Sequence, residues 1–139
     1  MIVSLHVATG AAGGSLVRSR LAALALGPVL HLAGDLTPHR DFASRRFEIA
    51  SGLGALGLLT VMRGPLDPAT LCAATASAPD LEHVLPFPRP GGRSLFPSHR
   101  IQGWHKEGGI SAPAQLATAA VLLGLVLFGR QRLNGVRPH

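Results

Sequence analysis

The chain has 139 residues, of which 47% are hydrophobic and 14% are charged, and its formal net charge is +6. This length suits one domain with a modest core and excludes a separate cofactor-binding domain. Soluble globular proteins have about a quarter of their residues charged. The low charged fraction therefore indicates a membrane-associated helical protein or a very alanine-rich soluble one. The positive charge comes from arginine, with Lys106 the one lysine. Because few aromatic residues accompany it, we expect no nucleic-acid partner.

Apolar stretches separated by turn and capping residues predict an all-α protein of four to five helices. Ser19, Asp67 and Ser111 are suitable N-caps, and Pro68 suits the first position of a helix. Pro38 disfavours helical geometry at the residue before it, so the second helix should end near Leu36. The helices are expected at about residues 2–17, 20–36, 42–62, 68–77 and 112–130.

Residues 84–110 are rich in proline and glycine and predict one long irregular loop. Loops of this length are uncommon unless they are functional or disordered, and the histidines in this one favour function. Residues 108–129 carry no charge and are long enough to cross a bilayer. We therefore expect residues 1–139 to form one compact helical bundle that is embedded in or associated with a membrane, although a buried helix of a soluble bundle would also fit.

His31, Asp35 and His39 follow one another at steps of four in an otherwise apolar segment. His31 and Asp35 lie one helical turn apart on one face, and the break at Pro38 lets the chain bring His39 beside them. Two imidazoles and a carboxylate that converge suit a divalent cation such as zinc. A single histidine at a helix end is more often a cap, but this triplet favours a metal site.

More candidate ligands follow near helix ends and in the long loop. Asp80 and His83 are three residues apart and share one side of a helical turn. The loop adds His99 and His105, and Arg100 suits a bidentate clamp on a phosphate. His6, in the first apolar stretch, is either a hydrogen-bonded histidine or a further ligand. Together these residues could hold two or three divalent metals, which activate water near neutral pH.

The order of three short motifs resembles the small bacterial membrane-bound, metal-dependent hydrolases. The motifs are His31-x3-Asp35-x-x-Pro38-His39, Pro79-Asp80-x-x-His83 and His99-Arg100 with His105. The first is also similar to the His-x3-Asp motif of zinc-dependent phospholipase C and of the single-strand-specific zinc nucleases. The chain departs from the family pattern at Glu82, where an aspartate is usual, and in the longer interval from His99 to His105, with Trp104 in place of a small hydroxyl residue.

The resemblance implies hydrolysis of a phosphoester, including one in a phospholipid or related membrane substrate, by metal-activated water in the bacterial inner membrane. It implies zinc, or alternatively manganese, as the cofactor. The catalytic residues would be Asp35, Asp80 and Arg100. The metal ligands would be His31, Asp35, His39, Asp80, His83, His99, His105 and His6.

Two other interpretations remain open from the residues. The first is a non-catalytic integral membrane or adaptor protein whose histidines form a closed structural metal site with four protein ligands. The second, suggested by charge alone, is a small helical DNA-associated protein. The sequence does not decide the oligomeric state.

Overall fold

The computed structural model describes residues 1–134, with side chains as far as residue 129. Within that part all regular structure is helical, and His39 makes two isolated bridges, to Glu107 and Ile110, outside any strand. The elements are α1 (Val3–Leu16), α2 (Arg20–Leu36), α3 (Arg45–Arg63), α4 (Pro68–Ser77), η1 (Ala78–His83), η2 (Pro90–Gly92), α5 (Pro97–Arg100) and α6 (Ala112–Asn134).

The all-α class expected from the sequence is confirmed, and local capping explains most helix boundaries. Ser19 Oγ accepts a hydrogen bond from the Ala22 amide at the start of α2, and the Asp67 carboxylate accepts one from the Ala69 amide at the start of α4. The third helix starts a few residues later than expected, because Ser44 caps it by accepting from the amide of Phe47. The expected loop over 84–110 contains the short helices η2 and α5.

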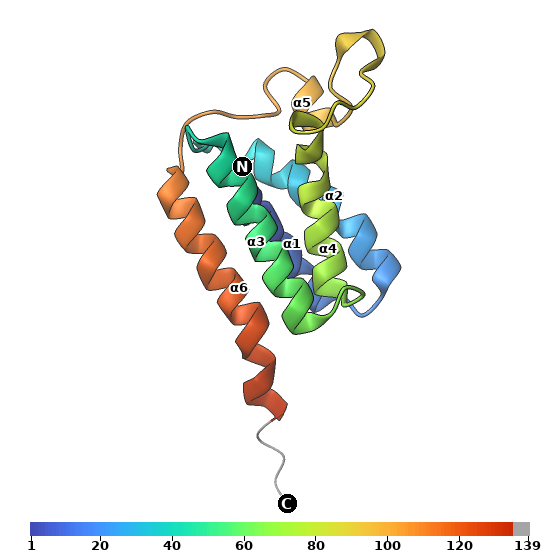
Figure 1. The fold of residues 1–139 in the computed structure, drawn as a ribbon, viewed down its shortest axis with the longest axis vertical. Helices are drawn as coiled ribbons and strands as arrows, with labels where there is room; N and C mark the ends of the chain where they lie inside the picture. Colours follow the sequence, from blue (N-terminus) through green and yellow to red (C-terminus); the bar gives the residue numbers. More distant parts are fainter. Residues whose placement is uncertain (135–139) are drawn as a thin grey trace, which may run out of the picture.

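Helix α1 forms the centre of the bundle and packs against α2, α3, α4 and α6 (Figure 1). Its closest neighbour is α4, and glycines make this approach possible. A Cβ atom on Gly14 would lie 2.4 Å from the Pro68 carbonyl oxygen, and one on Gly10 would lie 2.8 Å from the Ala73 Cα. The small-residue stretch therefore forms a helix in which Gly10 and Gly14 face the backbone of α4.

The irregular segment folds over one end of the bundle, where α2 ends and α4 runs into η1 (Figure 1). The backbone of residues 105–110 runs beside residues 38–40, with the His39 amide donating to the Lys106 carbonyl at 3.1 Å. Gln115, on α6, is fully buried and joins three segments. Its side-chain oxygen accepts from the Ile2 amide, and its nitrogen donates to the Arg40 and Ile110 carbonyls.

One helix in the described part of the chain is long and apolar enough to cross a membrane, namely α6 over Ala112–Gly129. Only 28% of that segment is buried in the bundle. The core helix of a soluble protein can have the same length and composition, so this feature alone is weak support for membrane insertion.

The close α1–α4 contact predicts that Gly14→Ala destabilises the fold. The new methyl would overlap Pro68 and the Cys72 side chain, and overpacking of this kind costs about 1–3 kcal/mol. Gly57→Ala on α3 is the matched control, because a Cβ there has nothing within 4 Å. It should be neutral or stabilising by up to about 1 kcal/mol through helix propensity. Denaturant unfolding of both variants checks this, and equal effects would contradict the packing argument.

Candidate metal centre

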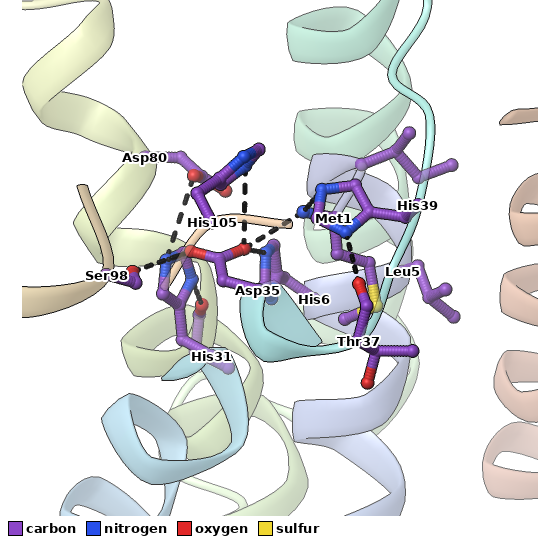
Figure 2. A network of polar contacts seen from close by, with 12 residues as sticks. Met1, Leu5, His6, His31, Asp35, Thr37, His39, Asp80, Ser98 and His105 are labelled. Atoms are coloured by element: carbon purple, nitrogen blue, oxygen red, sulfur yellow. Dashed lines mark hydrogen bonds and ion pairs between the residues drawn. The ribbon is translucent and has the colours of Figure 1, made fainter. Parts of the chain in front are cut away.

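Asp35, in the last turn of α2, is the residue about which the polar groups of this end of the bundle gather (Figure 2). Its side chain is 1% exposed. The oxygen Oδ2 lies 3.0 Å from His31 Nε2, 3.3 Å from His99 Nε2 and 2.6 Å from the Ser98 hydroxyl, which donates to it. The oxygen Oδ1 lies 3.2 Å from His6 Nε2 and 2.9 Å from the Met1 amine. The two oxygens of one carboxylate thus face two different groups of residues.

The second nitrogen of three imidazoles is held by a hydrogen-bond acceptor. His31 Nδ1 lies 2.8 Å from the Ala76 carbonyl oxygen, and His39 Nδ1 lies 2.6 Å from the Thr37 carbonyl oxygen. His99 Nδ1 contacts a carboxylate oxygen of Glu82. Because these oxygens only accept, each Nδ1 must carry the proton. The Nε2 atoms of His31 and His99 face Asp35 Oδ2, so each either donates a proton to that oxygen or, with its lone pair free, ligates a cation beside it, as ligating histidines do.

His31, Asp35 and His99 form the first candidate site, which we call centre A. His31 Nε2 and His99 Nε2 are 3.3 Å apart, and with Asp35 Oδ2 they make a triangle with edges of 3.0–3.3 Å. Two tetrahedral zinc ligands at 2.0–2.1 Å from the ion lie about 3.4 Å from each other. Asp80 Oδ1 lies 4.0 Å from His31 Nε2 and 3.8 Å from His99 Nε2, at the place of a fourth ligand. Centre A therefore fits a tetrahedral ion with little adjustment.

Asp35, His39 and His105 form the second candidate site, centre B, on the other side of the same carboxylate. Their ligand atoms all lie within 4.8 Å of one another, and His105 Nε2 is 4.0 Å from Asp35 Oδ1. The Met1 amine lies between Asp35 and His39 and contacts both (Figure 2). Centre B is looser than centre A, and its ligands would need to move closer together to hold an ion.

The pKa values of two carboxylates in the cluster, Asp35 and Asp80, are shifted in opposite directions. Burial raises the pKa of Asp35, but hydrogen bonds from His31, His6 and His99 outweigh burial and hold it well below its usual range. Burial raises the pKa of Asp80 to about 6, assisted by the negative charge of Asp35. One Asp80 oxygen, Oδ2, is buried without a hydrogen-bond partner. A cation at centre A would offset both the carboxylate repulsion and this desolvation.

Two residues that were not among the predicted ligands, Ser98 and Glu82, form hydrogen bonds to side chains that were. Ser98 is buried and donates to Asp35 Oδ2, and Glu82 is buried and holds His99 Nδ1. Glu82 also accepts from the Leu95 amide, which ties the irregular segment to η1. In the sequence, Glu82 stands where the family motif has an aspartate, and Ser98 is adjacent to His99; these were the signals of the two roles.

The structure brings together all eight residues predicted as metal ligands. His6 is fully buried, bonds to Asp35 and stacks on the His31 ring with centroids 4.0 Å apart. His83 is exposed, and its ring centroid lies 4.3 Å from that of His99. It forms a further potential ligand group with Asp80 and His99. Several of these His and Asp groups could hold a metal ion. Arg100, by contrast, is exposed and does not line the cleft beside the cluster.

A cleft of about 340 Å³ opens onto centre A from the α3 side. Asp80, His99 and His105 contribute to its wall from the cluster, and Arg45 and Glu48 contribute from the first turn of α3. Among the described residues no carboxylate oxygen lies within 4.0 Å of Arg45, so it forms no ion pair with Glu48, its neighbour on the cleft wall. The cleft gives a small molecule access to the candidate ligands.

Comparison of the chain with protein-family models, with curated proteins and with solved structures finds no match.

The convergence on Asp35 predicts that the protein purified without chelators binds at least one zinc or manganese ion per chain. Asp35→Asn should lose that metal, because the variant removes the carboxylate charge that centres A and B share. Glu107→Gln is the control, since Glu107 is exposed and its side chain belongs to neither centre. Elemental mass spectrometry of the three proteins measures the effect. Equal metal content in wild type and Asp35→Asn would contradict the site.

Proposed function

We propose that this chain is a metal-dependent hydrolase that acts on a phosphoester. Centre A would hold the first ion through His31, Asp35 and His99, with Asp80 adjacent. Centre B would hold a second through Asp35, His39 and His105. The observation that carries the proposal is the orientation of His31 and His99, whose Nε2 atoms face Asp35 Oδ2 while an acceptor holds each Nδ1. Imidazole nitrogens whose other nitrogen is already a committed donor face buried carboxylate oxygens, and such an arrangement calls for a cation.

Zinc or manganese bound here would polarise a phosphoryl oxygen and lower the pKa of bound water. The residues of the chain have separate tasks. Asp35 would orient both centres, because each of its oxygens faces one of them. Asp80 lies on the cleft wall with its side chain 17% exposed, so it is placed to accept a proton from water in the cleft. Glu82 and Ser98 would hold His99 and Asp35 in position.

Arg45 lines the cleft, and its guanidinium would bind the phosphoryl group of the substrate. It lines the cleft together with His99 and His105, and among the described residues it forms no ion pair of 4.0 Å or less, although Asp41 and Glu48 line the same cleft. An arginine can bind two oxygens of a phosphate at once. We therefore assign to Arg45 the role that the resemblance gave to Arg100.

A membrane location for the chain is part of the proposal. Large apolar side chains are exposed on several helices, including Leu21 (79%) on α2, Val61 (85%) on α3 and Leu125 (65%) on α6. Exposed apolar surface of this extent marks a contact with lipid or with another protein. Together with the length of α6, it favours insertion in the bacterial inner membrane, with membrane lipid as a partner.

The function is tested with p-nitrophenyl phosphate and bis-p-nitrophenyl phosphate as probes. The purified protein should release p-nitrophenol from at least one of them, and chelation should abolish the release until zinc or manganese is added back. Asp35→Asn should lower kcat/KM at least 100-fold. Stoichiometric metal with no turnover, and with no water left on the ion in spectra of the cobalt-substituted protein, would instead favour the non-catalytic protein with a closed structural site.

The assignment of the phosphate clamp is tested by comparing Arg45→Met with Arg100→Met. Loss of a charge-assisted hydrogen-bond pair costs about 1.5–3 kcal/mol, so Arg45→Met should raise KM about 10- to 100-fold. Arg100→Met should change KM less than twofold, because Arg100 does not line the cleft. Steady-state kinetics on the better probe measures both. A larger effect at Arg100 would return the role to that residue.

A further inference from the structure

A second hollow, of about 430 Å³, lies between α3 and the α4–η1 segment. We call it the α3–α4 groove. Its wall is almost entirely apolar, and Asp80 is the one charged residue in it among the described part of the chain. Its apolar wall includes Leu53 and Leu56 from α3 and Leu81 and Leu85 from the other side.

The α3–α4 groove is continuous with the cleft at centre A. Four residues line both of them, namely Val3, Ile49, Asp80 and Val84. Asp80 stands at the junction, with Oδ1 directed at the His31 and His99 nitrogens. A ligand whose charged end lies in the cleft beside Arg45 can therefore continue into the groove without leaving the surface of the protein.

The groove leaves apolar side chains open to contact with a ligand. Leu53 is 61% exposed, Leu81 43% and Leu85 45%. Covering such side chains with a hydrocarbon chain is favourable, and each methylene buried is worth about fourfold in affinity. No polar partner is needed along the groove, because its wall is apolar away from Asp80.

A third hollow, of about 380 Å³, is also apolar but does not fit this role. It is lined by Pro28, Phe87, Phe96 and their neighbours, and it shares no lining residue with the cleft at centre A. Of these two apolar hollows in the described part of the chain, the α3–α4 groove is the one that can hold part of a molecule whose other part lies at the candidate metal centre.

We propose that the substrate is an amphiphile with one hydrocarbon chain, which lies in the α3–α4 groove while its phosphoester lies in the cleft beside Arg45. The identity of the head group rests on the proposed function. The position of the chain rests on the groove and its continuity with the cleft. A single groove selects for one chain, so a lipid with two chains beside the phosphoryl group would leave one of them without a site.

The experiment uses a dodecylphosphonate with a photoreactive diazirine at its chain end, applied to the full chain in lipid nanodiscs and mapped by mass spectrometry. A phosphonate is not hydrolysed, so the readout does not depend on turnover. Label should appear on residues 53–56 of α3 or on residues 81–85. Dodecylphosphonate should compete with it, and methylphosphonate should compete at least 100-fold less well.

Leu53→Gln and Leu58→Gln form the matched pair. Both change an exposed leucine on α3 in the same way, but only Leu53 lines the groove. Leu53→Gln should weaken labelling about tenfold, and Leu58→Gln should change it less than twofold. Equal competition by the long-chain and short-chain phosphonates would overturn the proposal. Equal weakening of the labelling by both variants would also overturn it. Loss of a dimer in Leu53→Gln without loss of labelling would also overturn it and assign the groove to a second copy of the chain.

The outcome also separates this inference from the proposed function. If the labelling meets these expectations and no phosphoester is hydrolysed, the proposed function is wrong and the groove is a binding site for a one-chain amphiphile. If p-nitrophenyl phosphates are hydrolysed and labelling does not depend on chain length, the hydrolase stands and the amphiphile proposal is wrong.

Discussion

The burial of the Asp35 carboxylate is the constraint on which the rest of the structure depends. An ionised carboxylate removed from water must be compensated by donors or cations, because the uncompensated charge is very costly. Here the compensation comes from three separate parts of the chain: the N-terminus and α1 contribute Met1 and His6, α2 contributes His31, and the irregular segment contributes Ser98 and His99. This one side chain thus joins residues that are 98 positions apart in the sequence, from Met1 to His99.

The packing of the bundle also positions the residues that surround Asp35. Glycines on α1 bring its backbone against α4, which places His6 against the face of the His31 ring and the Ala76 carbonyl at its Nδ1 atom. At the other side of the cluster, Gln115 bonds to the backbone beside Ile2, Arg40 and Ile110. Gly109 has φ +65°, and a Cβ there would lie 2.3 Å from the Pro38 carbonyl oxygen, so a glycine is needed for the strand-like approach that carries His105 toward Asp35.

The sequence predicted the helices and the core of the candidate site well, because both depend on local rules. Steps of four placed His31 and Asp35 on one face, Pro38 ended the helix, and capping residues located most helix starts. What the sequence did not predict depends on tertiary contacts. Ser98, Glu82 and Arg45 acquire their roles only when the irregular segment and α3 close over the end of α2. Arg100 is next to His99 in the chain, but it lies on the exposed side of a helix of four residues.

The folded chain separates its ionisable groups from its exposed apolar side chains. The ionisable groups of the cluster gather at one end of the bundle, whereas α2, α3 and α6 expose leucine and valine along their length. Asp80 lies at the boundary, since it borders both the cleft at centre A and the apolar α3–α4 groove. A soluble phosphoester would leave that groove unfilled, and a closed structural metal site does not require an open cleft. The two hollows meet at a candidate metal ligand, and this junction is why a charged, reactive head and an apolar tail are the best match for the surface that the chain presents.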